Sequence, residues 1–172
     1  MNGIAKILEK FDKKALVKKV IPLLLDSMKV PQLSVNVLPS ILSVMEKPNF
    51  LTTTEFREYI WPSISKLCKA KELPAQSLFI ILKNTELFLK YVGPSEFQAH
   101  FMPLLLKSLE CGVAKLQFLA LNKVTVMYKS LDYTSVKTSL IPRILSILEK
   151  SPTMQLKIKV LETMLEMISG ID

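Results

Sequence analysis

Four prolines recur along the chain at almost constant intervals, and this repetition restricts the possible folds more than any other feature. The intervals are 40, 41 and 39 residues, and the prolines are Pro22, Pro62, Pro103 and Pro142. Each follows two apolar residues, as Val20 and Ile21 precede Pro22. A fixed period of this length is typical of repeat proteins, in which each unit buries its apolar face against its neighbours.

A second series of helix-breaking residues divides each repeat into two parts. These residues are Pro31, Pro74, Gly112 and Pro152, at intervals of 43, 38 and 40. Ten residues before the recurrent prolines stand Asp12, Thr52, Gly93 and Asp132, and three of these four are good helix N-caps. Thr52 and Glu55 also have the spacing of a capping box. Each repeat therefore reads as two helices joined by a short connection.

The caps and breakers together predict the helix ranges. The first helices are expected near residues 13–30, 53–70, 94–109 and 133–149, and the second near 32–46, 75–91, 113–129 and 153–169. Each first helix contains a recurrent proline, which removes a backbone donor and clashes with the preceding turn, so we expect a bend there. The second helices have apolar residues on more than one side, which indicates burial between neighbouring helices.

These features predict an all-α fold, specifically a HEAT-type α-solenoid coiled into a right-handed superhelix. The chain has 49% hydrophobic residues and only four glycines, a balance that favours helices. An armadillo repeat would need a third short helix and a glycine between helices, so HEAT is preferred. We expect one domain over residues 1–172, with a partial repeat at 1–11 and about four helical hairpins at 12–47, 52–91, 93–130 and 132–170.

The two ends of the sequence suggest a fragment of a longer protein. Residues 3–11 have the pattern of a second helix whose first helix is absent. The last expected helix is apolar on several sides, whereas dedicated capping repeats have a polar outer face. Met154, Met164 and Met167 in this helix are expected to pack against a further repeat.

Two stretches of the sequence resemble a known family. Residues 132–143 form the pattern D-Y-x-S-x-K-x-x-L-I-P-R. This pattern resembles the HEAT region of the SCY-like pseudokinases, in particular the member associated with coated vesicles. Residues 11–24, with Lys13, Lys14 and Leu16 ahead of Pro22, are similar to the first helices after the kinase-like domain in this family.

The resemblance implies an architecture and a cellular role. It implies a preceding kinase-like domain that is inactive or weakly active, then HEAT repeats and a flexible tail. ATP would bind only through the kinase-like domain. The role implied is clathrin-dependent vesicle traffic between Golgi, endosomes and plasma membrane, with coat or adaptor proteins as partners. The implied location is cytoplasmic, peripheral on Golgi, endosomal or clathrin-coated vesicles.

The sequence contains no recognisable catalytic, metal-binding or phosphate-binding motif, so we expect neither enzyme activity nor a cofactor. It lacks a glycine-rich phosphate loop and the H-R-D and D-F-G signatures of protein kinases. His100, the single histidine, is expected to be a packing or surface residue. Cys68 and Cys111 lack metal-ligand spacing, and Cys111 has no histidine or oxyanion motif near it in sequence. Both are expected in the core or at its boundary.

Trp61, the single tryptophan, directly precedes a recurrent proline. An exposed tryptophan would be a natural interface anchor. Since the other repeats have Ile21, Met102 and Ile141 at the equivalent position, we expect Trp61 in the core.

The chain is basic, with 23 lysines and arginines, 15 acidic residues and a net charge of +8. Arginine is preferred for bidentate phosphate recognition, and only Arg57 and Arg143 are present, so nucleic acid is disfavoured as a partner. The densest basic group could meet an acidic protein segment or an anionic membrane, or could be a solvated face. It comprises Lys10, Lys13, Lys14, Lys18 and Lys19. Lys83 and Lys123, 40 residues apart on successive second helices, could form a basic ladder for an acidic motif.

Three interpretations of function stay open. The preferred one is a non-catalytic scaffold whose stacked repeats bind a peptide or helix of a trafficking partner. A nuclear transport or nucleic-acid-associated scaffold would need acidic or arginine-rich repeats, and the sequence shows neither. A third interpretation is a brace for the adjacent kinase-like domain or a module for self-association. No stretch approaches the roughly 20 apolar residues of a membrane-spanning helix, and the N-terminus lacks the features of a signal peptide.

Overall fold

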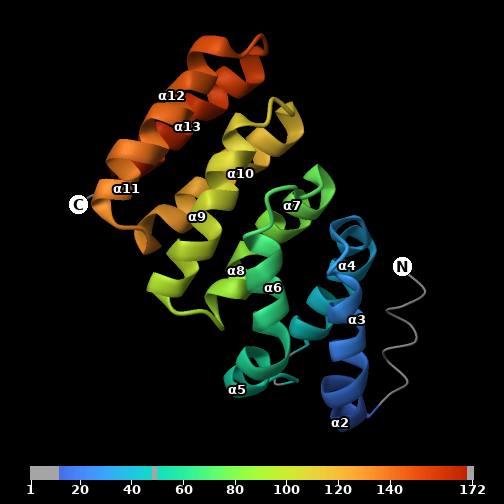
Figure 1. Ribbon diagram of the computed structural model, residues 1–172. Helices are drawn as coiled ribbons and strands as arrows, with labels where there is room; N and C mark the ends of the chain where they lie inside the picture. Colours follow the sequence, from blue (N-terminus) through green and yellow to red (C-terminus); the bar gives the residue numbers. More distant parts are fainter. Residues whose placement is uncertain (1–11, 48–49, 170–172) are drawn as a thin grey trace. The chain divides into compact units, whose positions relative to one another are not determined.

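A computed structural model of the chain describes residues 12–47 and 50–169, and these residues form helices and turns with no strand. The expectation of an all-α fold is therefore confirmed. The chain divides into two compact units at the junction of Tyr91 and Val92. Figure 1 labels the helices of both units in the order of the chain. Each unit contains two of the predicted hairpins, and each hairpin is a first helical segment followed by a second one.

The first helical segments of the N-terminal unit are each interrupted by a π-helical turn. One runs through α2 (Lys13–Ala15), a π-turn at Leu16–Val20 and α3 (Ile21–Ser27). The next runs through α5 (Thr53–Glu55), a π-turn at Phe56–Ile60 and α6 (Trp61–Cys68). Both segments lie within the ranges expected from the caps and prolines.

The π-turns accommodate the recurrent prolines. Pro22 has no N–H, and its ring would press on the carbonyl four residues earlier in a regular α-helix. In the structure, the N–H of Ile21 instead bonds the carbonyl of Leu16, five residues earlier. The N–H of Trp61 bonds Phe56 in the same way, directly before Pro62. The wider turn gives the proline ring room, which the sequence pattern had predicted only as a bend.

The C-terminal unit contains one helix with this interruption and one without it. The first helical segment of its second hairpin consists of α11 (Tyr133–Ser135), a π-turn at Val136–Leu140 and α12 (Ile141–Lys150). By contrast, α9 (Pro94–Glu110) continues as an α-helix through Pro103. The three interrupted segments begin at an N-cap side chain that accepts a backbone N–H, whereas Gly93 gives α9 no such bond.

The second helices agree with prediction except at one position. They are α4 (Ser34–Met45, after a 3₁₀ turn at Pro31–Leu33), α7 (Ala75–Lys83), α8 (Thr85–Leu89), α10 (Ala114–Met127, before a 3₁₀ turn at Tyr128–Ser130) and α13 (Met154–Ser169). The continuous helix expected over 75–91 was wrong, because Asn84 separates α7 from α8. The Asn84 side-chain amide donates to the carbonyl of Ile80 at 2.8 Å. Asparagine competes in this way with the helix backbone.

Aromatic rings fill the core of the N-terminal unit. Phe56 and Phe88 are fully buried, and Tyr91 stacks on Phe56 with ring centroids 4.7 Å apart. Trp61 is 7% exposed, with its ring 5.9 Å from that of Phe56, so its predicted core position is confirmed. Between α4 and α7, the buried hydroxyls of Ser34 and Ser77 are 2.6 Å apart.

The core of the C-terminal unit lies around α10, which contacts both α9 and α13. Phe97 and Phe101 of α9 stack with centroids 4.4 Å apart and are fully buried. The turn from α9 to α10 passes through Gly112, whose φ of +71° lies in the left-handed region that favours glycine. The turn thereby returns the chain so that α10 packs along α9.

Candidate functional site: the interaction surfaces

Of the residues with the greatest chemical reactivity, His100 and Cys68 are buried and Cys111 is exposed. The His100 ring is 9% exposed and its Nδ1 lies 2.9 Å from the carbonyl of Glu96. Burial raises the pKa of the Cys68 thiol to about 12, so this thiol stays protonated at neutral pH. Cys111 is exposed, which corrects the expectation of a core or boundary position. In the part of the chain that the structure describes, no three His, Cys, Asp or Glu side chains are placed to hold a metal ion.

The predicted basic cluster is exposed along the first helical segment. Lys13, Lys14, Lys18 and Lys19 lie on α2 and the following π-turn, and all four are exposed. Lys10 lies outside the described residues. Leu23, four residues after Lys19, is 74% exposed, so an apolar side chain stands beside this basic surface.

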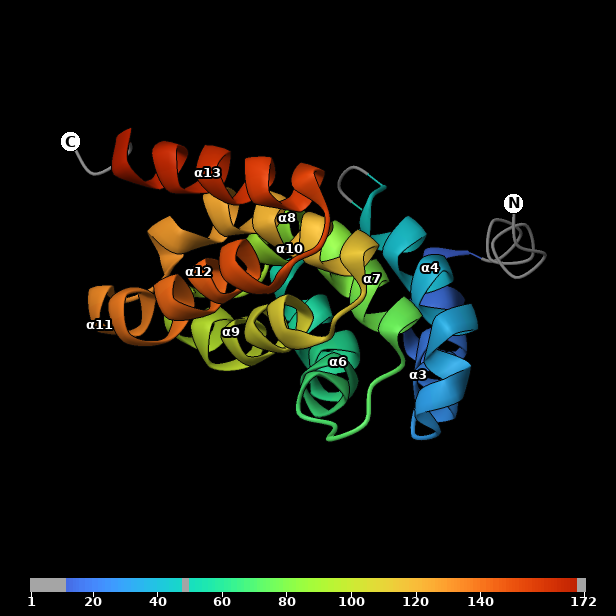
Figure 2. The same cartoon turned by 90° about the horizontal axis from the view of Figure 1, so that it is seen from above.

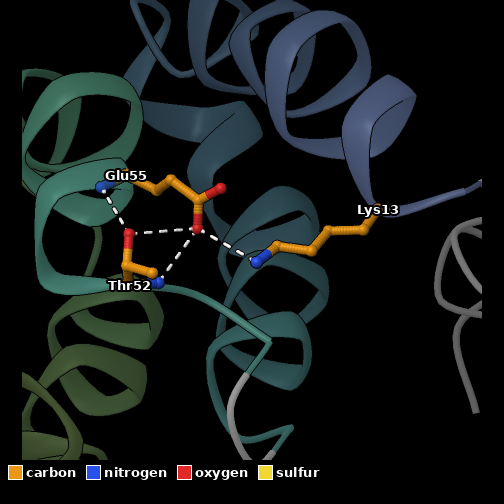
Figure 3. Close-up of polar contacts among 3 residues, drawn as sticks. All are labelled: Lys13, Thr52 and Glu55. Atoms are coloured by element: carbon orange, nitrogen blue, oxygen red, sulfur yellow. Dashed lines mark hydrogen bonds and ion pairs between the residues drawn. The ribbon is translucent and has the colours of Figure 1, made fainter.

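Lys13 differs from its neighbours because it joins two successive helical hairpins. Its Nζ lies 3.3 Å from Oε2 of Glu55, in α5 (Figure 3). The same Nζ lies 5.9 Å from the centroid of the Phe50 ring. This ion pair partly neutralises Lys13. Of the four lysines of the basic cluster that the structure describes, Lys13 is therefore used within the fold, and Lys14, Lys18 and Lys19 are directed to solvent.

Glu55 is held by the capping box that the sequence predicted. The backbone N–H of Glu55 donates to Oγ1 of Thr52 at 3.1 Å, and the N–H of Thr52 donates to Oε2 of Glu55 at 3.0 Å (Figure 3). The hydrogen bond from the Thr52 backbone, together with those from Lys13 and the Thr52 hydroxyl, lowers the pKa of Glu55 despite some desolvation. The carboxylate is therefore charged at neutral pH and fixes the position of Lys13.

The proposed basic ladder involves residues in different environments. Lys83 is exposed at the last position of α7, in the N-terminal unit. Lys123 is half-buried in the middle of α10, in the C-terminal unit. The ladder stays a prediction, and Lys83 is the more accessible of the two side chains.

A groove of about 550 Å³ lies in the C-terminal unit, where the α9–α10 turn approaches the α12–α13 turn. Arg143 and Glu110 line it, with Nε of Arg143 2.6 Å from Oε1 of Glu110. Nη1 of Arg143 also donates to the carbonyl of Ser139 at 2.9 Å. Arg143 looked isolated in the sequence because its partner is 33 residues away and belongs to the preceding hairpin. Its role in this unit is to connect α9 and α12.

An exposed apolar stripe runs along α13, and the sequence analysis did not identify these residues as an interaction surface. The exposed fractions are 69% for Met154, 49% for Ile158, 58% for Leu161, 67% for Leu165 and 63% for Ile168. The regular spacing of these residues is visible in the sequence, but the buried residues of the same helix have the same spacing, so it did not show which face is exposed. Of the three methionines expected to face a further repeat, Met167 is 4% exposed within the unit, Met164 is half-buried and Met154 belongs to the stripe.

Comparison with known proteins finds relatives for most of the chain. Over 143 residues, or 83% of the chain, the sequence is 32% identical to SCY1-like protein 2 of Homo sapiens, and the same values hold for SCY1-like protein 2 of Mus musculus. The match spans 15% of the length of each relative. No protein-family model matches the chain, and no solved structure does. Among the described residues, no helix is both long and apolar enough to cross a membrane.

Proposed function

We propose that this chain, which is homologous to a segment of SCY1-like protein 2, is a non-catalytic scaffold for protein–protein interactions in clathrin-dependent vesicle traffic. The site of action would be cytoplasmic, peripheral on Golgi, endosomal or clathrin-coated vesicles. The family resemblance of residues 132–143 supports this role. The partners would be coat or adaptor proteins.

The observation that carries the proposal is the repeated helical hairpin. In each unit, the second helices pack on one another, α4 on α7 and α10 on α13. Side-by-side packing of this kind is how HEAT repeats build an extended surface for other proteins. We therefore propose a right-handed HEAT-type solenoid with repeats at 12–47, 52–91, 93–130 and 132–170.

The exposed lysines indicate the chemistry of the partner. Lys14, Lys18 and Lys19 form a compact basic surface beside the exposed Leu23. An acidic segment that also carries an apolar side chain would complement this surface. Lys10 and Lys13 would extend it, although Lys13 is already paired with Glu55. Lys83 and Lys123 would supply a secondary contact for the same kind of acidic segment.

The test is a binding assay with coat proteins released from purified clathrin-coated vesicles. The immobilised chain is compared with a Lys14→Glu/Lys18→Glu/Lys19→Glu variant. The matched control carries Lys66→Glu/Lys69→Glu/Lys90→Glu, because these three lysines are exposed in the same unit and give the same change in net charge. The proposal expects clathrin or adaptor subunits to bind the native chain and the control, and to be lost from the first variant.

Two results would contradict this function. If neither clathrin nor adaptor subunits are retained, the trafficking role is wrong. If both triple variants lose binding equally, the interaction depends only on net charge and the assigned surface is wrong. Retention of nuclear transport factors or RNA-bound proteins from cytosol, without coat proteins, would favour the nuclear or nucleic-acid alternative.

A further inference from the structure

The helix α13 has two apolar faces, of which one is buried. The buried face consists of Leu156, Val160, Thr163 and Met167, each at most 4% exposed. It packs within the C-terminal unit, where α13 contacts α10 and α12. In Figure 2, both of these helices lie on one side of α13. The exposed stripe from Met154 to Ile168 is the second face.

The spacing of the exposed stripe fits a partner helix. Its five residues follow one another at intervals of four, three, four and three. This is the heptad spacing of a coiled coil, with Ile158 and Leu165 at a positions and Met154, Leu161 and Ile168 at d positions. The stripe extends over about 21 Å at 1.5 Å per residue. A facing helix with the same spacing would cover all five side chains.

We propose that the partner is a second copy of this chain, with the two α13 helices packed in parallel. Lys157 lies at the g position before Ile158, and Glu162 lies at the e position after Leu161. In a parallel pair, each g residue meets the e residue five positions later in the other helix, so each Lys157 would meet a Glu162. The stripe is thus complementary to itself in charge as well as in apolar spacing.

The charges also select the parallel orientation. In an antiparallel pair centred on the stripe, e positions face e positions, which would bring the two Glu162 side chains together. Glu162 is accessible for a new contact, because it is 57% exposed even though its Oε2 lies 3.4 Å from Nζ of Lys159. Lys159 is 13% exposed and lies over the ring of Phe118, on the buried side of the helix.

The helix is already formed before it pairs, which favours association. Two heptads are short for an isolated coiled coil, because helix nucleation is costly in a free peptide. Here the buried face holds α13 in a folded unit, so pairing does not require the helix to form. This proposal is independent of the trafficking role, since it uses no residue of the basic cluster.

The first test measures the mass of the full chain in solution by analytical ultracentrifugation over a range of concentrations. We expect a monomer–dimer equilibrium for the native chain. A Leu161→Glu/Leu165→Glu variant should weaken it by about 100-fold or more, as expected for charges placed in an apolar interface. The matched control is Leu23→Glu/Val30→Glu, which adds the same two charges at residues that are 74% and 50% exposed and lie outside the stripe. Unchanged circular dichroism melts would show that each variant is folded.

The second test fixes the orientation. In a parallel pair, each residue at a d position lies opposite its own copy. Leu161→Cys in a Cys111→Ser background should therefore form a disulfide-linked dimer on mild oxidation, whereas Leu23→Cys in the same background should not. Cys68 is buried and does not interfere. Lys157→Glu should weaken the dimer by about three- to tenfold, and Lys157→Glu/Glu162→Lys should restore it.

Three results would overturn the proposal. A native chain that stays monomeric at all concentrations would show that a second copy does not cover the stripe. The stripe would then bind a helix of a different protein segment. A dimer that persists in Leu161→Glu/Leu165→Glu would place the interface elsewhere. A dimer that depends on the stripe but yields no Leu161→Cys disulfide would exclude the parallel pairing.

Discussion

Replacing Thr52 by alanine should destabilise the N-terminal unit by about 1 kcal/mol, within a usual range of about 0.5–2 kcal/mol for an N-cap. The change removes the Oγ1 that accepts the N–H of Glu55 at 3.1 Å. It also removes the contact of this hydroxyl with Oε2 of Glu55 at 3.2 Å. The hydrogen bond from the Thr52 backbone to Glu55 involves no Thr52 side-chain atom and can persist. The loss of stability should therefore not exceed that expected for a single N-cap residue.

The assay is equilibrium urea unfolding followed by circular dichroism, with hydrogen exchange to locate the effect. In a thermal melt followed by the same circular dichroism signal, 1 kcal/mol corresponds to about 4–8 °C in Tm for a unit of this size. Thr54→Ala is the matched control, because Thr54 is exposed in the same first turn but does not cap the helix. If Thr52→Ala and Thr54→Ala have the same free energy of unfolding, the capping box does not stabilise this unit and the reasoning is wrong.

The pH dependence gives a second measurement of the same contact. Folding lowers the pKa of Glu55 from its ordinary value of 4.5, so its charged form favours the folded state. This stabilisation is present above pH 4.5 and is lost as the pH falls through the lower folded-state pKa. The stability difference between the native chain and Glu55→Gln should therefore shrink on acidification below pH 4.5. If the difference in stability does not change with pH, the charge of Glu55 does not contribute to the stability of the fold.

Three further predictions concern the cores and the turn. Phe56→Ala should cost about 3–5 kcal/mol in urea unfolding, because this fully buried ring contacts Trp61 and Tyr91; a loss below 1 kcal/mol would contradict the described core. Cys111 should react rapidly with a thiol reagent at neutral pH and Cys68 only on unfolding, because Cys68 is buried with a pKa of about 12; equal labelling rates by mass spectrometry would refute this. Gly112→Ala should cost about 1–2 kcal/mol from backbone strain alone, since an added Cβ would meet no atom within 4 Å. Gly112→Asn should recover part of this loss, and equal stability of all three chains would show that the φ of +71° is not required.

The helix positions were predictable because the signals that set them are local. N-caps such as Thr52 and breakers such as Pro152 act within one turn, so their spacing determined the helix ends. The interruption at Asn84 was missed because its side chain competes with the helix backbone only in some surroundings. The π-turns were missed because a helix can adapt to an internal proline in several ways. The spacing of residues in the sequence does not show which of these occurs.

The contacts between hairpins were beyond prediction for a different reason. The pairs Lys13–Glu55 and Arg143–Glu110 join residues that are 42 and 33 positions apart, so they depend on how neighbouring hairpins pack. The two faces of α13 were also indistinguishable, since Leu156 and Leu161 are the same residue type. Only the packing on α10 shows which of them is covered.

The π-turns have a consequence for the engineering of consensus repeats from this sequence. In all four first-helix segments the proline is ten positions after the N-cap, but a π-turn uses more residues per turn than an α-turn. Residues beyond the proline in α3, α6 and α12 are therefore rotated about the helix axis relative to those aligned with them in α9. Averaging the four sequences column by column would combine positions of different helical phase. A consensus repeat should be derived from the three interrupted helices, with α9 treated separately.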